Sequence, residues 1–248
     1  MESTNPTAAI LVIGDEILTG RTREGNAWHL AGVLANAGFD LKEMRVVSDD
    51  HDRIVEAIRA LDKSLGGAYD HLFTSGGIGP THDDVTADAV ADAFGVGIGI
   101  NEQARAAMQA RYDKLGLELT GNRLRMARIP DGAELIENAA SAAPGFTLGG
   151  THVMAGVPEV FSAMVDALIP RLVGGRPLVS REVEIMRGES DVAEDLAEIA
   201  RQNPKLSLGS YPFTREGRYG TKLVVRGLDE PAVETAFAQL CQRIGVTP

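Results

Sequence analysis

A glycine-rich stretch between a predicted strand and a predicted helix constrains this chain more than any other feature. The apolar run Leu72-Phe73-Thr74 precedes it, and residues 85–90 follow it with the pattern of a helix start. Between them, residues 76–84 read Gly-Gly-Ile-Gly-Pro-Thr-His-Asp-Asp. Glycines let backbone N–H groups approach an anion, and the N-terminus of the following helix adds a partial positive charge. Because the two carboxylates would repel a phosphate, the stretch predicts a divalent metal between them and the ligand.

Strand and helix patterns alternate through the first part of the chain. Apolar runs predict strands at residues 8–13, 39–47 and 70–75, and helical spacing predicts helices at 26–38, 52–65 and 85–94. This order predicts an α/β fold, a parallel sheet with helices on both faces. Ligands bind at the carboxyl ends of the strands in such sheets. We therefore expect three loops to lie at one edge: residues 14–22 with Asp15 and Glu16, the turn at Asp49 and Asp50, and residues 76–84.

The remaining pattern predicts the rest of this domain and a smaller second one. After a helix at 102–115 we expect a short basic helix at 122–130, strands at 134–137, 146–148 and 152–155, and a helix from 158 to 172. Residues 174–177, Gly-Gly-Arg-Pro, form the best linker, so the predicted domains are 1–173 and 174–248. In the second domain we expect strands at 178–186, 205–211 and 221–226, helices at 189–202 and 230–244, and a polar turn at 214–220. This order predicts a small α+β domain with an antiparallel sheet.

Charge and composition narrow the partners. The net charge is −11, from 24 basic and 35 acidic residues, which argues against a nucleic-acid ligand. No apolar run approaches the roughly 20 residues that span a bilayer, and no Lys/Arg run offers a membrane patch. The polar N-terminus lacks the pattern of a secretory signal. Cys241 is the only cysteine and is expected in a helix core, so no intrachain disulfide can form, which fits a cytoplasmic protein.

Several separated motifs, in this order, resemble the MoaB/Mog (molybdopterin-binding) domain family. They are residues 14–20 (Gly-Asp-Glu-Ile-Leu-Thr-Gly), Asn26, Asp49-Asp50, residues 76–86, Ala143-Pro144-Gly145-Phe146 and Gly156-Val157-Pro158. The variant that this chain resembles most is the N-terminal half of CinA-type competence/damage-inducible proteins. The Gly-Pro-Thr-His-Asp-Asp form also looks like the molybdopterin-binding-like domain of FAD synthases. The resemblance covers residues 8–172, and the small second domain looks like the one that follows in CinA-type proteins.

The resemblance implies an oligomer, a dimer or trimer, that binds molybdopterin or a nucleotide, and it leaves a choice of chemistry. CinA-type members resemble metal-dependent pyrophosphatases that split ADP-ribose, and the FAD synthase domain has been linked to FAD hydrolysis. We therefore expect a pyrophosphohydrolase that uses Mg²⁺, Mn²⁺ or Co²⁺. The alternative is the molybdenum-cofactor branch, whose members bind molybdopterin and adenylylate it. From the residues given we expect neither the amidase domain of full-length CinA nor a gephyrin-like or MoeA-like extension, and this expectation weakens a dedicated cofactor-assembly role. A third hypothesis is a catalytically silent ligand sensor or scaffold.

The resemblance and the residue chemistry together nominate the site residues. The expected catalytic residues are Asp84 and Asp50, which match the family's functional aspartates, and the expected metal ligands are Asp84, Asp83 and Asp15. The expected phosphate-binding residues are Gly76, Gly77, Gly79 and Thr81, and the expected substrate-binding residues are Asn26, Asn122, Arg123 and His82.

Each of these residues has a purely structural alternative. Asp84 and Asp50 are also favourable helix N-caps, and glycines suit any turn that needs a positive φ. Asp15 and Glu16 can hold their loop through local hydrogen bonds. The basic stretch with Asn122, Arg123 and Arg125 can be a solvated helix face. Trp28 has helical spacing and is expected in the core rather than as a stacking platform.

Overall fold

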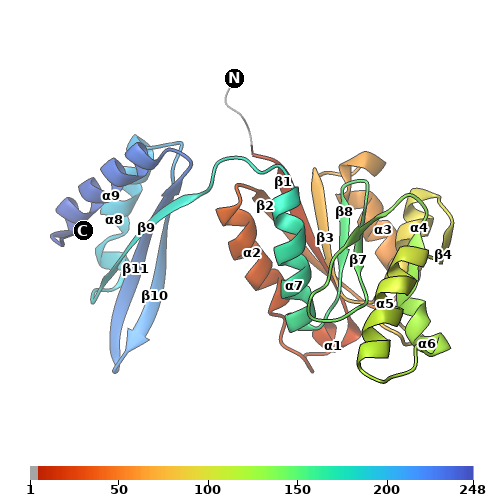
Figure 1. Cartoon of the computed structure of the whole chain (residues 1–248). Helices are drawn as coiled ribbons and strands as arrows, with labels where there is room; N and C mark the ends of the chain where they lie inside the picture. Colours follow the sequence, from red (N-terminus) through yellow and green to blue (C-terminus); the bar gives the residue numbers. More distant parts are fainter. Residues whose placement is uncertain (1–4, 248) are drawn as a thin grey trace. The chain divides into compact units, whose positions relative to one another are not determined.

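The computed structural model describes residues 5–247 and divides into two compact units, Met1–Gly175 and Arg176–Pro248. The predicted boundary at residues 173/174 lies beside this division. Figure 1 shows both units in the colours of the sequence. Each unit has its own sheet. The first unit has a hydrophobic core on each face of its main sheet, and the second unit has one core.

The first unit is built on a mixed sheet that is mostly parallel. Its strand order is β2-β1-β3-β8-β7-β6. The parallel strands are β1 (Thr7–Ile13), β2 (Asp40–Val47), β3 (His71–Ser75) and β8 (Thr151–Met154). The antiparallel strands are β7 (Gly145–Leu148) and β6 (Glu134–Ile136). The predicted α/β fold class is confirmed.

Helices cover both faces of this sheet, as Figure 1 shows. On one face lie α2 (Asn26–Asn36) and α7 (Pro158–Leu168). On the other lie α3 (His51–Leu61), α4 (Thr86–Phe94) and α5 (Glu102–Lys114). The side chains of β1 alternate between the two cores: Leu11 and Ile13 contact the α3–α4 side, whereas Ile10 and Val12 contact the α2–α7 side. The unbroken apolar run from Ala8 to Ile13 is therefore what a strand buried on both faces requires.

Two predicted segments of the first unit differ in the structure. Within the predicted loop 14–22, the short helix α1 (Asp15–Leu18) forms. The predicted basic helix at 122–130 is only α6 (Gly121–Leu124), the 3-10 turn η2 (Arg125–Ala127) and then β5 (Arg128–Pro130). Strand β5 pairs with β4 (Ile98–Ile100) in a two-stranded antiparallel sheet, and Pro130 lies at the end of this short ladder, where a proline is tolerated.

The helix α2 corrects the prediction for Trp28. This side chain is 80% exposed, whereas Ala27, Leu30 and Leu34 form the buried stripe of the helix. Trp28 is one position away from that stripe and therefore points to solvent. The expectation of a core tryptophan was wrong.

The second unit is a two-layer α+β structure, as predicted. Its antiparallel sheet has the order β10-β11-β9, with β9 (Val179–Ile185), β10 (Ser207–Arg215) and β11 (Arg218–Gly227). Helices α8 (Ala193–Gln202) and α9 (Glu230–Ile244) pack on one face, where Cys241 is buried as predicted. The predicted turn at 214–220 is shorter, because Glu216 (φ 52) and Gly217 (φ 73) alone join β10 to β11. Within the described residues, no helix is long and apolar enough to cross a membrane.

Candidate functional site

A pocket of about 450 Å³ lies at the carboxyl edge of the parallel strands. Its lining begins where β1, β3 and β8 end, and it includes the turn after β2 and part of α7. The residues that line it are Ile13, Glu16, Asp49, Gly76, Gly77, Ile78, Gly79, Pro80, Asp83, Asp84, Met126, Ser141, Ala143, Ala155, Gly156, Val157, Val160 and Met164. The predicted meeting of three loops at one sheet edge is therefore confirmed.

The first two glycines of the loop are required by close packing. Gly76 (φ 113) and Gly77 (φ 69) have left-handed backbones that favour glycine. A Cβ at Gly76 would lie 2.1 Å from the Ile13 carbonyl oxygen, and one at Gly77 would lie 2.1 Å from Thr86 Oγ1. The Thr86 hydroxyl donates to the Gly76 carbonyl oxygen (3.1 Å), and the Thr86 N–H donates to the Gly77 carbonyl oxygen (3.0 Å). The start of α4 is thus bound directly to the glycine turn.

Asp84 organises the rest of the loop. Its Oδ1 accepts from Gly79 N–H (2.6 Å), and its Oδ2 accepts from both the N–H (2.8 Å) and the hydroxyl (2.5 Å) of Thr81. Two of the amides expected to bind phosphate therefore already have an anionic partner. Within the described residues, the N–H groups of Gly77 and Ile78 have no protein acceptor, so these two can receive a ligand phosphate.

Asp49 brings the loop after β2 into the pocket. Its Oδ2 accepts from the Asp15 N–H (2.8 Å), which joins this loop to the one after β1. Burial raises the pKa of Asp49, and the negative charges of Glu16, Asp15 and Asp83 push it in the same direction. The carboxylates of the segments after β1 and β3 thus act on the Asp49 carboxyl, which follows β2.

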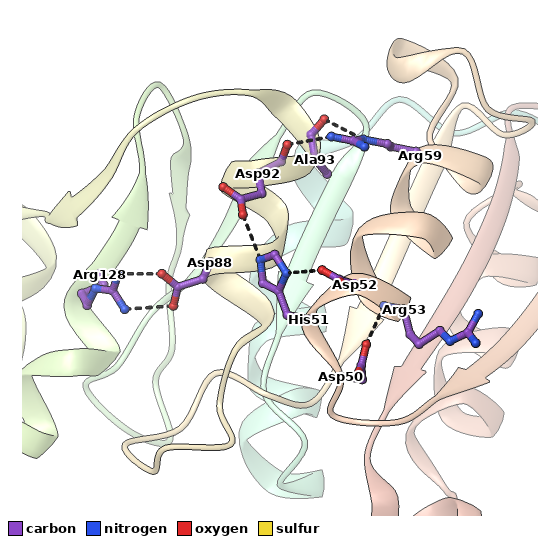
Figure 2. Close-up of polar contacts among 9 residues, drawn as sticks. All are labelled: Asp50, His51, Asp52, Arg53, Arg59, Asp88, Asp92, Ala93 and Arg128. Atoms are coloured by element: carbon purple, nitrogen blue, oxygen red, sulfur yellow. Dashed lines mark hydrogen bonds and ion pairs between the residues drawn. The ribbon is translucent and has the colours of Figure 1, made fainter.

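The neighbouring Asp50 has a different place. Figure 2 shows its side chain at the start of α3, where Oδ1 accepts from the Arg53 N–H at 2.9 Å. Asp50 does not line the pocket, whereas Asp49 does. The structure therefore gives Asp50 the N-cap alternative, and Asp49 occupies the place that was expected of it.

Polar contacts fix α4 to its neighbours, and Figure 2 shows them together. Arg128 and Asp88 form a two-pronged ion pair at 2.6 and 2.9 Å. His51 joins α3 to α4, with Nε2 3.0 Å from Asp92 Oδ2, and its Nδ1 lies 3.0 Å from Asp52. The hydrogen bond with Asp52, together with the Asp92 charge, raises the pKa of His51. Arg59 donates to the Asp92 carbonyl (3.0 Å) near the end of α4.

The remaining predicted residues lie at or outside the pocket rim. The His82 side chain is fully exposed, and Asn122 is exposed in α6. Arg123 donates to the Glu118 carbonyl at 2.5 Å and covers the Tyr112 ring, so it is held away from the pocket. Asp15 offers its backbone N–H rather than a pocket-lining side chain. Asn26 lies in a smaller hollow beside the pocket.

The apolar wall of the pocket could not be foreseen from the sequence. It comes from Met126, Val157, Val160 and Met164, which lie far from the glycine loop in the chain. No local motif marks these side chains, because only the packing of η2 and α7 beside the loop brings them together. Methionine adapts to irregular or flat ligand surfaces.

A divalent cation fits the chemistry of this site but is not held by the protein alone. Among residues 5–247, no three His, Cys, Asp or Glu side chains form a group able to hold a metal ion. Glu16, Asp49 and Asp83 nevertheless offer hard carboxylate oxygens to one pocket. Mg²⁺ is typically held by one or two carboxylates together with substrate phosphates, so a full protein ligand set is not required.

The sheet and the pocket at its carboxyl edge define an α/β protein of the MoaB/Mog type. Residues 9–174 match the family model described as "Probable molybdopterin binding domain", and the chain belongs to this family. Residues 177–247 match the model of the FAD synthase middle domain.

Relatives and one solved structure support the assignment. A protein of Caldivirga maquilingensis is 39% identical over 206 residues, which is 80% of this chain and 78% of that one. One of Metallosphaera sedula is 36% identical over 204 residues, 79% of this chain and 76% of the other. The crystal structure of CinA from Thermoplasma acidophilum, a protein described as of unknown function, has a TM-score of 0.60 and 34% identity. The matched region covers 66% of this chain and 98% of the CinA chain.

Proposed function

We propose that this protein is a divalent-metal-dependent pyrophosphatase that acts on a nucleoside-diphosphate-linked substrate such as ADP-ribose or FAD. One observation carries the proposal. Four carboxylates, Glu16, Asp49, Asp83 and Asp84, line a pocket beside a glycine turn, and among the described residues no lysine or arginine lines it. A site of this charge repels a diphosphate unless cations accompany the ligand.

Different groups of the pocket would bind the phosphate, hold the ion and accept a proton. The amides of Gly77 and Ile78 receive one phosphate, and Asp84 keeps the loop in shape through Gly79 and Thr81. Asp49, Asp83 and Glu16 would hold the ion, which when bound neutralises the diphosphate and makes water a better nucleophile. Water adds to one phosphorus, the bridging P–O bond breaks, and a pocket carboxylate takes the proton of the water.

The apolar wall gives the ligand's ring a place. Met126, Val160 and Met164 line the same pocket as the acidic loops. A flat base or flavin ring can stack on them while the diphosphate lies on the loop side. The volume of about 450 Å³ lies within the range of small-molecule sites, roughly 300 to 1,000 Å³.

Product analysis tests the proposal. Purified full chain is incubated with ADP-ribose, FAD or NADH, with EDTA or with Mg²⁺, Mn²⁺ or Co²⁺, and the nucleotides are separated by chromatography. We expect AMP from at least one substrate only when a metal is present. Absence of AMP under every metal, in protein whose fold is verified by circular dichroism, would rule the activity out.

The family description favours a second candidate, molybdopterin binding with adenylyl transfer. The same amides would hold the pterin's phosphate, and the methionine wall would hold its ring. Mixing the protein with molybdopterin and Mg-ATP separates the candidates, because adenylylated pterin forms only in this case. A ligand that binds without turnover in either assay would favour the sensor or scaffold hypothesis.

A further inference from the structure

A second, smaller hollow of about 70 Å³ adjoins the main pocket. The two share Ile13, Glu16 and Gly156 in their linings. The inner lining of the smaller hollow includes Asn26, the first residue of α2, and Ser75, the last residue of β3. Asn26 is only 8% exposed and Ser75 only 3% exposed. Such burial is costly for polar groups that have no partner.

The hydrogen bonds of Asn26 fix which way its amide faces. Its Nδ2 donates to the Gly156 carbonyl and to Ser75 Oγ, both at 2.8 Å. A carbonyl oxygen can only accept, so the nitrogen must be the atom on that side. Both amide hydrogens are therefore used. Within the described chain no donor meets Oδ1, and this oxygen is left as a free acceptor at the hollow.

The same bond fixes the role of Ser75. Because its Oγ accepts from Asn26, its own hydrogen is available to donate. Among residues 5–247 no acceptor meets that hydrogen, and Ser75 lines the hollow. The hollow thus presents one acceptor and one donor, each from a largely buried residue, with the carboxylate-bearing Glu16 at the boundary with the pocket.

A sugar hydroxyl matches this arrangement, because it donates one hydrogen bond and accepts others. A volume of about 70 Å³ admits the hydroxyl edge of a sugar but not a ring system. A phosphate fits less well than a hydroxyl, because it offers an acceptor where the Asn26 oxygen needs a donor. Among the charged residues that line the hollow, the carboxylates of Glu16 and Glu24 also outnumber the one cation, Arg23. An apolar group would leave Asn26 and Ser75 without partners. In dinucleotide-binding α/β folds, a carboxylate hydrogen-bonds a ribose hydroxyl, and Glu16 offers such a group here.

We propose that this hollow, the diol subsite, binds the ribose hydroxyls of a nucleotide whose diphosphate lies on the glycine turn. The assignment rests on the proposed function. That function places the diphosphate of the substrate, and the subsite adds a place for its ribose. It makes the protein selective for ribosylated diphosphates through Asn26 and Ser75, neither of which touches the phosphate. Both residues are thus specificity-determining residues.

Calorimetric titration of the full chain with two non-hydrolysable probes tests the subsite. The probes are α,β-methylene-ADP and its 2′,3′-dideoxy analogue, each with Mg²⁺. We expect the diol compound to bind at least about 10-fold more tightly, because the analogue leaves buried polar groups unpaired. Ser75→Ala should reduce this ratio to about 3-fold or less. Ser180→Ala, an exposed serine of β9, should leave the ratio unchanged.

The possible results separate the subsite from the proposed function. Equal affinity of wild type for the two probes overturns the diol subsite and leaves the proposed function standing. A failure of both probes to bind overturns the proposed function and the subsite with it. The comparison on wild type needs no variant, so it stands even if Ser75→Ala fails to fold, which thermal unfolding monitors.

Discussion

Asp49 and Asp50 are neighbours in the chain with different tasks. Asp49 lines the pocket and accepts from the Asp15 N–H, whereas Asp50 begins α3. A motif match that names both aspartates therefore does not decide which of them meets the ligand, because a shift of one residue reverses the answer.

The capping role of Asp50 gives the first prediction. Asp50→Ala should lower the free energy of unfolding by about 1 kcal/mol, because the Arg53 N–H loses its acceptor. Asp50→Asn should be close to neutral, since asparagine caps equally well. Urea titration measures both variants. If Asp50→Asn abolished AMP release without loss of stability, the residue would have a chemical role after all.

A buried histidine pair gives the second prediction. His152 is 2% exposed, and its Nε2 lies 3.0 Å from His71 Nδ1. Burial, with a smaller contribution from the His71 charge, lowers the pKa of His152 from 6.5 to about 3. Between these pH values His152 is protonated in the unfolded chain but neutral in the folded chain. The free energy of unfolding therefore falls as the pH drops from about 6.5 towards 3.

At pH 5 this histidine should cost about 2 kcal/mol of stability relative to pH 8. His152→Gln removes the group and should flatten the dependence of the unfolding midpoint on pH between 5 and 7. Urea titrations at a series of pH values measure the slope. A slope equal to that of wild type would show that other groups cause the acid sensitivity.

At the scale of elements, the position of α4 determines where the glycine turn and Asp84 lie. The glycine turn and Asp84 lead directly into it, and Thr86 binds back to the turn. Helix α4 is held from two sides, by His51 and Arg59 of α3 and by Arg128 of β5. Figure 2 shows these contacts along the helix. Asp88, Asp92 and Arg128 do not line the pocket. They therefore act on the ligand only through the position of α4.

Loosening this helix is the third prediction. Arg128→Gln breaks the ion pair with Asp88, which is about two-thirds buried, and should destabilise the protein by about 1 kcal/mol. We expect KM to rise more than kcat falls, because the loop is displaced but its carboxylates remain. Arg181→Gln, which breaks exposed pairs in the second unit, is the control and should change neither constant. Unaltered kinetics in Arg128→Gln would mean that the loop does not depend on this contact.

Most elements could be predicted because their signals are local. The apolar runs of β1 and β3 and the amphipathic spacing of α3 are visible within a few residues. The meeting of the loops at one sheet edge could also be predicted, because each loop directly follows a predicted parallel strand. Other features depend on tertiary contacts. The Arg123 guanidinium lies over the Tyr112 ring, and β5 forms where the end of a helix was predicted. Met126 and Met164 line one pocket only because distant segments of the chain pack together.

At the scale of the whole molecule, the two units have separate cores. The first centres on residues such as Leu11, Phe73 and Phe161, and the second on Leu223 and Leu240. The two family models meet at the same place, since one ends at residue 174 and the other begins at 177. Each unit therefore has the apolar interior that independent folding requires.

Truncation is the fourth prediction. A fragment of residues 1–175 should fold alone with a cooperative thermal transition and should retain metal-dependent AMP release within about 3-fold of the full chain, because every lining residue of the pocket lies in the first unit. Calorimetry and the nucleotide assay measure both properties. A folded but inactive fragment would give the second unit a direct part in the reaction.

The central claim is that the acidic pocket binds a diphosphate together with a cation and splits it. The most direct measurement is the rate of AMP release from ADP-ribose by full-length wild type, Asp49→Asn and Asp50→Asn, with saturating Mn²⁺ and with EDTA. We predict metal-dependent release by wild type, a loss of at least about 100-fold in Asp49→Asn, and a rate close to wild type in Asp50→Asn. Release by wild type in EDTA, or an unchanged rate in folded Asp49→Asn, would contradict the claim.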